Sequence, residues 1–214
     1  MKQNKSKVII ITGSIGTGKS TVTNILRKMG YTVLDSDEIV HEGYNVGKDM
    51  YNDVVNYFGK DILNFDNTIN RQVLGKIVFN DEKNLKKLNE IVHKTVVKEL
   101  MKGVKTSTDD VLFLDIPLAL EEAEHLKKNG IIYDEIWLVY VNSELQRKRL
   151  INRALIENKN PEDVLTIINK QIPIEKKVSM VNEVINNEGT IEDLNFQLIN
   201  LLKRKGVHRK VRHG

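Results

Sequence analysis

The sequence contains no cysteine and no apolar run that approaches the ~20 residues of a membrane-spanning helix. The first absence excludes disulfides, thiolate metal sites and a cysteine nucleophile. The second predicts no contact with a membrane, and the short apolar stretch near the N-terminus is too brief for a secretion signal. Internal repeats are also absent. We therefore expect a cytoplasmic protein, and the length of 214 residues predicts one domain, or one domain with insertions, with a sizeable core.

The net charge of +4 is concentrated at the C-terminus. Residues 203–214 hold six of the 33 Lys and Arg residues and no acid, so the rest of the chain is slightly acidic. We expect this basic tail to be a solvated, disordered end. Salt-dependent nucleic-acid binding through the tail is the alternative. Because the body is not basic, we expect no nucleic-acid partner.

The strongest chemical pattern is a phosphate-binding loop near the N-terminus. The apolar run Val8–Ile11 does not alternate with polar residues, which indicates a strand buried on both faces. It leads into Gly13-x4-Gly18-Lys19-Ser20, the P-loop spacing.

Each part of this loop has a physical role. Its glycines let the main-chain N–H groups turn inward, and the next helix N-terminus completes an anion cradle. We expect Lys19 to reach the β- and γ-phosphates and the Ser20 hydroxyl to bind Mg²⁺. The nucleotide-binding residues are then Gly13, Ser14, Ile15, Gly16, Thr17, Gly18, Lys19, Ser20 and Thr21. The loop alone does not distinguish a kinase from a GTPase or an ATP-driven machine.

Apolar strands alternate with helical patterns along the rest of the chain. The predicted strands are 7–12, 31–35, 110–115, 135–141 and 184–187. The predicted helices are 20–29, a segment from 36 to about 44, one opening at Pro117, 143–157, 162–171 and 191–204. Residues 45–105 show helical patterns without a convincing strand, as in an insertion that receives a second substrate. The helix–break–helix pattern after the fourth strand is typical of a lid.

Two carboxylates end predicted strands, Asp35 and Asp115. Ligands of open α/β sheets bind outside the carboxyl ends of the strands, so both are candidate site residues. A simpler interpretation is that Ser36 or Asp37 caps the following helix. We expect Asp37 to be the cap and Asp35 to be catalytic.

Other polar candidates lie in the helical segments. Gln146, Arg149 and Arg153 have the spacing of one helix face, which either binds phosphates or is an ordinary solvated face. Arg71 and His93 stand out in the insertion, although such residues more often lie at a surface.

Several separated segments together resemble the dephospho-CoA kinase family. They are TGSIGTGKST (12–21), VLDSDEIVH (33–41), RQVLGKIVF (71–79), LNEIVH (88–93), FLDIPLALE (113–121), VYVNSELQRKRLINR (139–153), QIP (171–173) and VINNEGTIEDL (184–194). The resemblance implies a P-loop kinase fold of the α/β class, with a five-stranded parallel sheet flanked by helices. Its single domain, 1–202, would have a core of 7–44 and 108–202, a CoA-binding insertion at about 45–105 and a lid at about 145–172.

The resemblance also implies a reaction. ATP with Mg²⁺ would phosphorylate the ribose 3′-hydroxyl of dephospho-CoA, giving coenzyme A and ADP in the last step of coenzyme A synthesis. The implied catalytic residues are Asp35 as base, Lys19, Arg149 and Arg153. Those implied on the substrate side are Asp35, Arg71, His93 and Asp115, with Ser20 as the metal ligand.

The chain departs from the family pattern at a few positions. Lys94 follows His93 where proline is common, and Leu120 follows Ala119 where a second leucine and an aromatic residue are usual. Ile167 stands where the family usually has a lid arginine; either Arg153 or Lys170 compensates for this loss, or turnover is slower.

Two alternative classes of P-loop protein can be compared with the motifs of this sequence. A kinase for a nucleoside monophosphate or shikimate-type acceptor would share the P-loop and lid. A GTP-dependent switch usually carries Asn-Lys-x-Asp, whereas the nearest stretch, Asn169–Ile172, lacks the final aspartate, and Asp115 lacks a glycine three residues later.

Overall fold

The computed structural model describes residues 6–207. The strands are β1 (Lys7–Thr12), β2 (Thr32–Asp35), β3 (Val111–Asp115), β4 (Glu135–Tyr140) and β5 (Glu183–Asn186). The helices are α1 (Lys19–Lys28), α2 (Ser36–Gly43), α3 (Asp49–Phe58), α4 (Arg71–Phe79), α5 (Glu82–Thr106), α6 (Ala123–Lys128), α7 (Ser143–Ile156), α8 (Pro161–Asn169), α9 (Ile174–Lys177) and α10 (Ile191–Arg204), with short 3₁₀ turns at Lys60–Ile62 and Val178–Met180. Within the described range no helix is both long and apolar enough to cross a membrane.

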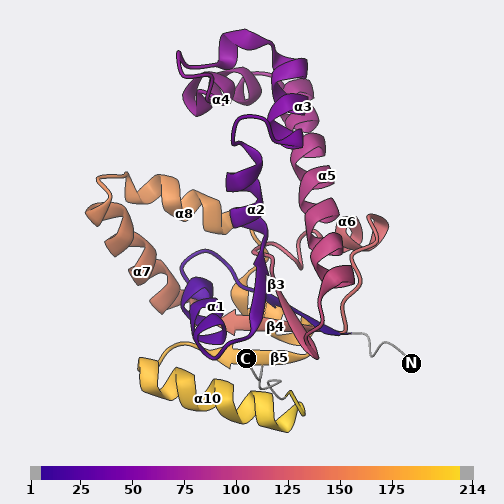
Figure 1. Cartoon of the computed structure of the whole chain (residues 1–214). Helices are drawn as coiled ribbons and strands as arrows, with labels where there is room; N and C mark the ends of the chain where they lie inside the picture. Colours follow the sequence, from indigo (N-terminus) through magenta and orange to yellow (C-terminus); the bar gives the residue numbers. More distant parts are fainter. Residues whose placement is uncertain (1–5, 208–214) are drawn as a thin grey trace. The chain divides into compact units, whose positions relative to one another are not determined.

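The five strands form one sheet in the order β2-β3-β1-β4-β5 (Figure 1). The pairs β1–β3, β1–β4 and β4–β5 are parallel. Ile11 pairs with Asp115 and Thr12 with Leu138, so these strands end at the same edge of the sheet. The predicted α/β fold with a five-stranded parallel sheet is confirmed.

The chain forms two compact units, which we describe separately. The P-loop unit comprises residues 1–34 and 104–214, and the helical unit comprises 35–103. The helical unit therefore begins about ten residues before the predicted insertion boundary and includes α2. Among the residues described, the only isolated β-bridge in this unit joins Leu63 and Ile69, and residues 45–105 contain no strand, in line with the prediction for this region.

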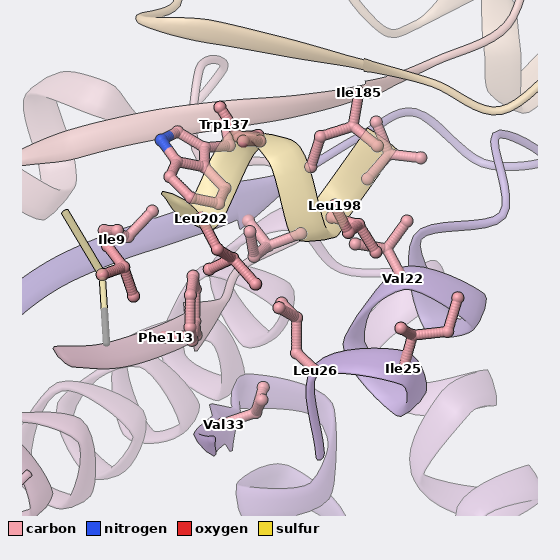
Figure 2. Close-up of a cluster of buried hydrophobic side chains, with 14 of the residues drawn as sticks. Ile9, Val22, Ile25, Leu26, Val33, Phe113, Trp137, Ile185, Leu198 and Leu202 are labelled. Atoms are coloured by element: carbon pink, nitrogen blue, oxygen red, sulfur yellow. The ribbon is translucent and has the colours of Figure 1, made fainter. Parts of the chain in front are cut away.

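The core of the P-loop unit lies between the sheet and helices α1 and α10 (Figure 2). Ile9 and Ile11 of β1 point into it, and Trp137 of β4 is fully buried there, as predicted. Ile10, on the other face of β1, is equally buried. Burial on both faces explains why the strand is a continuous apolar run.

The helical unit has its own core. Met50 and Val54 of α3 are fully buried, and Leu74 of α4 and Ile91 of α5 pack into the same cluster. These residues recur at helical spacing, so each helix buries one face.

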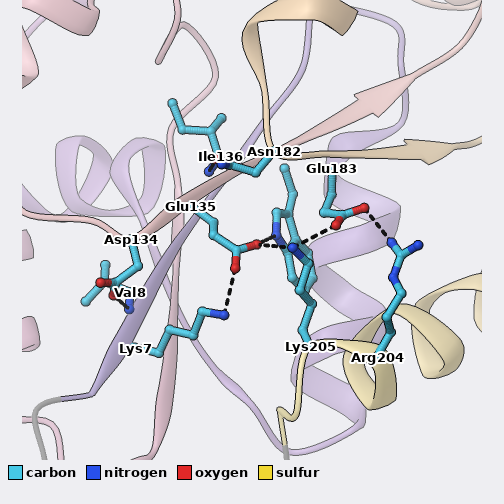
Figure 3. Close-up of polar contacts among 10 residues, drawn as sticks. Lys7, Val8, Asp134, Glu135, Ile136, Asn182, Glu183, Arg204 and Lys205 are labelled. Carbon is cyan, nitrogen blue, oxygen red and sulfur yellow. Dashed lines mark hydrogen bonds and ion pairs between the residues drawn. The ribbon is translucent and has the colours of Figure 1, made fainter.

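A polar cluster at the amino ends of the strands fixes the end of α10 (Figure 3). Glu135 accepts ion pairs from Lys7 at 2.7 Å and Lys205 at 2.9 Å, and Lys205 also reaches Glu183 at 2.7 Å. Val207 is buried. The prediction of a disordered tail from residue 203 is thus wrong for 203–207, because ion pairs and apolar burial order them. Residues 208–214 lie outside the described residues.

The segment after β3 is not the helix predicted to open at Pro117. Turns occupy 117–122, and the helix begins at Ala123. The Pro117 carbonyl accepts the Thr12 hydroxyl at 3.0 Å, and the N–H of Ile116 donates to Ile11 at 3.1 Å. These tertiary bonds tie the segment to the end of β1 instead of letting it continue as a helix.

Candidate active site

The P-loop turns directly from β1 into α1. Gly18 is the N-cap of α1, with φ 83° and ψ 28°, a left-handed conformation that glycine adopts at little cost. Among the described residues, no side chain caps this helix. Its first N–H groups are therefore left for a ligand, which is the arrangement that binds phosphate.

Side chains from three later segments hold this loop in shape. The Gln146 amide of α7 donates to the Ile15 carbonyl at 2.7 Å, and the N–H of Ile15 donates to Gln171 at 3.4 Å. The Asn187 amide, just after β5, donates to the Thr17 carbonyl at 2.8 Å. Main-chain groups of Ile15 and Thr17 are thus held by side chains from outside the loop.

Close packing adds to these hydrogen bonds. A Cβ at Gly16 would lie 2.8 Å from the Leu150 side chain, and one at Gly18 would clash with Asn187. The Thr17 hydroxyl donates to the Ser14 carbonyl at 2.9 Å inside the loop. Larger residues at these two glycines would therefore displace the loop.

Lys19 and Asp115 form an ion pair at the carboxyl edge of the sheet. Lys19 is the first residue of α1, and Asp115 is the last of β3. The Asp115 side chain is only 1% exposed, whereas the Lys19 side chain is 14% exposed. The structure therefore brings together the two residues that the sequence predicted at strand and loop ends.

Ser20 lies in the first turn of α1 and is exposed. Its hydroxyl and the Asp115 carboxylate, which contacts the neighbouring residue Lys19, are both hard oxygen donors of the kind that Mg²⁺ prefers. Among the described residues no group of three or more His, Asp or Glu side chains could form a complete metal cage.

Gln146, Arg149 and Arg153, predicted to share one face of α7, lie in three different environments. Gln146 is buried against the P-loop. Arg149 donates to the Asn187 carbonyl at 2.9 Å, and its Nη1 lies 3.7 Å from the position of a Cβ built on Gly18. Arg153 is exposed and bonds to Glu157 at 2.7 Å along the helix. Only the first two residues of this face lie at the loop.

Asp35 of the helical unit ends β2 and is itself the N-cap of α2. Its Oδ1 accepts the N–H groups of Asp37 at 2.8 Å and Glu38 at 3.2 Å. The prediction that Ser36 or Asp37 would be the cap is wrong. The extended backbone at Asp35, with φ −105° and ψ 121°, has the conformation that an N-cap requires.

Arg71 begins α4 and faces α2 within the helical unit. Its guanidinium lies 3.4 Å from His41 Nδ1 and 5.0 Å from the centre of the Tyr44 ring. Burial raises the pKa of Tyr44, and the charge of Arg71 partly offsets this effect. His93 lies half-buried on α5. The cation of Arg71 is thus held by an aromatic ring and an imidazole and remains exposed.

Reasoning from the sequence missed the residues that hold the P-loop. Gln171 and Asn187 were not singled out, and Gln146 was grouped with the arginines. Asn187 follows β5, so the convergence of parallel strand ends could have indicated it. His41 was also missed, although it ends one of the resembling segments.

Comparison with known proteins places these residues in a family. The family model described as dephospho-CoA kinase matches residues 7–193. The dephospho-CoA kinase of Carboxydothermus hydrogenoformans is 40% identical over 200 residues, 92% of this chain and 93% of the relative. That of Aquifex aeolicus is 42% identical over 188 residues, which are 87% of this chain and 91% of the relative. The crystal structure of TT1252 from Thermus thermophilus superposes with a TM-score of 0.75 at 30% identity, covering 93% of this chain and 97% of the other. The chain therefore belongs to the dephospho-CoA kinase family and is a kinase.

Proposed function

We propose that this kinase transfers the γ-phosphoryl group of ATP to the ribose 3′-hydroxyl of dephospho-CoA, giving coenzyme A and ADP. Family membership supports the substrate, and one structural observation supports the chemistry. The P-loop is held by Gln146, Gln171 and Asn187. It leads into α1, which begins at Lys19 and whose N-terminus has no side-chain cap among the described residues. This arrangement suits a bound triphosphate.

On the donor side, main-chain N–H groups of the P-loop and Lys19 would hold the β- and γ-phosphate oxygens. On binding ATP, Lys19 would either leave Asp115 for the phosphates or contact both. Ser20 would hold Mg²⁺ directly and Asp115 through water. When bound, the metal ion neutralises charge on the phosphate oxygens.

On the acceptor side, Asp35 would accept the proton of the ribose hydroxyl or orient that hydroxyl for attack. A carboxylate in this role contributes by positioning and by general base catalysis. Arg71, whose guanidinium is held by Tyr44 and His41, would bind an anionic group of dephospho-CoA, with His93 as a further substrate-side residue. Guanidinium groups bind phosphates through fixed, directional hydrogen bonds.

Arginines of the α7–α8 segment would neutralise the charge that develops during transfer. Arg149 is already at the P-loop, and Arg153 would move from Glu157 to the phosphates. Ile167, in the position of the usual lid arginine, is exposed on α8 and carries no charge. Arg149 and Arg153, with Lys170 at the end of α8, would supply the cationic contacts that remain. Excluding water from this site prevents hydrolysis of ATP.

An acceptor panel tests the proposal. Purified protein is given Mg²⁺ and ATP with dephospho-CoA, shikimate, AMP or CMP, and ADP release is followed for each acceptor. We expect turnover with dephospho-CoA to exceed turnover with every other acceptor, and Lys19→Met to abolish it. ADP release that is fastest with shikimate or a nucleoside monophosphate would overturn the substrate assignment. Replacing ATP by GTP in the same assay tests the nucleotide preference.

A further inference from the structure

A fully buried lysine lies outside the residues assigned to phosphoryl transfer. Lys177, the last residue of α9, has a side chain that is 0% exposed, and its Nζ lies 2.7 Å from Glu121 Oε1. This contact lacks hydrogen-bond geometry, and the Glu121 Oε2 is buried without a hydrogen-bond partner among the described residues. A buried ion pair that is incompletely hydrogen-bonded is often no more stabilising than apolar side chains of similar size. Stability therefore does not explain this pair well.

Glu121 connects the pair to the P-loop. The same oxygen, Oε1, accepts the N–H of Ile172 at 3.2 Å. The preceding residue, Gln171, accepts the N–H of Ile15 in the P-loop. Fixing Ile172 against Glu121 thus fixes the residue beside it, which holds the loop.

Helix α9 also contacts the beginning of the lid. Glu175 accepts the N–H of Ser143, the first residue of α7, at 3.2 Å. Ile174 is buried, so α9 is anchored by apolar contact as well as by charge. Residues 171–177 therefore bind the start of α7 through Glu175 and follow directly on the end of α8. Both ends of the α7–α8 helix pair meet at this short segment.

We propose that Lys177 and Glu121 are positioning residues that fix the base of the α7–α8 lid and, through Gln171, the nucleotide-binding shape of the P-loop. The inference rests on the proposed function only in taking the P-loop as the ATP site. It assigns neither residue a contact with substrate. The pair acts by restraining residues 171–177. This segment follows α8 in the chain and contacts the turn after β3 through Glu121.

Three variants separate positioning from stability. Glu121→Gln keeps an oxygen for Ile172 but removes the charge that faces Lys177. Lys177→Met removes the ammonium and keeps most of the side-chain volume, and the double variant removes both charges. Lys205→Met is the matched control, because Lys205 also forms ion pairs with carboxylates, but at the amino ends of β4 and β5.

ATP affinity by calorimetry is the first readout, together with Tm. We expect Glu121→Gln and the double variant to weaken ATP binding on the order of 10- to 10²-fold, the scale of loss from small misplacement of a site. We expect the Tm of the double variant to stay within a few degrees of the parent and Lys205→Met to lower Tm without weakening ATP binding. ATP binding at parental affinity in Glu121→Gln or in the double variant would overturn the inference, as would equal weakening in the control.

Lid position is the second readout. Because the chain has no cysteine, dyes can be placed only where cysteine is introduced, here at the exposed Asp163 of α8 and Asn200 of α10. In Asp163→Cys/Asn200→Cys protein we expect a narrow distribution of energy-transfer efficiency that broadens when Lys177→Met is added. An unchanged distribution would contradict the proposed role. Both readouts are independent of the acceptor, so a failure to phosphorylate dephospho-CoA would refute the proposed function and not this inference.

Discussion

Asp115 and Lys19 form an ion pair, with the carboxylate almost fully buried at the end of β3. The lysine that is expected to bind phosphate is therefore already held by an anion. A carboxylate and a triphosphate compete for the same ammonium group. ATP binding must break this contact or share it.

Asp115→Asn should affect nucleotide binding and turnover in opposite directions. Without the competing charge, Lys19 is released for phosphate, so ATP binding measured without Mg²⁺ should tighten. Turnover with Mg²⁺ should fall about 10- to 100-fold, as is usual when a residue that orients a metal ligand is lost. Calorimetry with EDTA and steady-state kinetics with Mg²⁺ measure the two effects. Weaker Mg²⁺-free binding would show that Asp115 supports Lys19 rather than competing for it.

Asp35 allows the cap and the proposed base to be separated. Asparagine is as good an N-cap as aspartate, so Asp35→Asn should keep the α2 cap and lose only the charge. We expect kcat to fall about 10²- to 10⁴-fold with ATP affinity unchanged. Asp35→Ala should show the same loss and also reduce stability by about 1 kcal/mol. Turnover of Asp35→Asn near the parental rate would exclude a base or orienting role.

Arg153 must leave Glu157 before it can reach a phosphate. We expect Arg153→Ala to lower kcat. A stabilising arginine contributes about 10³- to 10⁵-fold to kcat in phosphoryl transfer, which sets the upper limit of the loss. Glu157→Gln, which releases the arginine, should keep or raise kcat and serves as the matched control. Steady-state kinetics at varied ATP distinguish the roles, since a change confined to KM would indicate simple binding.

Glu135 should make stability depend on acid pH. Burial by itself raises the pKa of Glu135, but hydrogen bonds from Lys7, Trp137 and Lys205 more than offset this and lower it to about 2 (Figure 3). The unfolded chain binds its proton near 4.5, so the folded state gains stability above that pH and loses it as pH falls toward 2. We expect Glu135→Gln to lower the free energy of unfolding at pH 7 by about 1–2 kcal/mol, allowing for solvent screening.

Urea unfolding of the parent and Glu135→Gln at several pH values measures this effect. The difference between the two proteins should shrink between pH 4.5 and 2, where the parental carboxylate becomes protonated. A difference that stays constant over this range would show that the shifted carboxylate does not contribute to stability.

The three central strands could be predicted from the sequence because β1, β3 and β4 are buried along most of their length and therefore consist largely of consecutive apolar residues. The edge strands β2 and β5 are only partly buried. The bounds predicted for the last helix agree with α10, whose N-terminus carries a capping box between Thr190 and Asp193. The helix predicted after β3 was wrong because the Thr12 hydroxyl and the β1 backbone, distant in sequence, bind the turn at Pro117. Local propensity contains no information on such contacts.

For the candidate site, the sequence located the P-loop but not the side chains that hold it. The spacing of the P-loop marks Lys19 and Ser20 directly, because the chemistry depends on local backbone geometry. Adjacent residues that can all cap a helix cannot be ranked by type, so the cap at Asp35 was assigned to its neighbours. The roles of Gln171 and Lys177 depend on contacts between distant segments, and nothing in their local sequence distinguishes them from exposed polar residues.

The position of the new phosphate on the product tests the central claim most directly. Purified protein is incubated with Mg²⁺, ATP and dephospho-CoA, and the product is examined by phosphorus NMR beside a Lys19→Met control. The account predicts one new phosphate monoester on the ribose 3′-oxygen, formed by the parent and absent with the control. No phosphorylated product, or a phosphate at another oxygen, would contradict it.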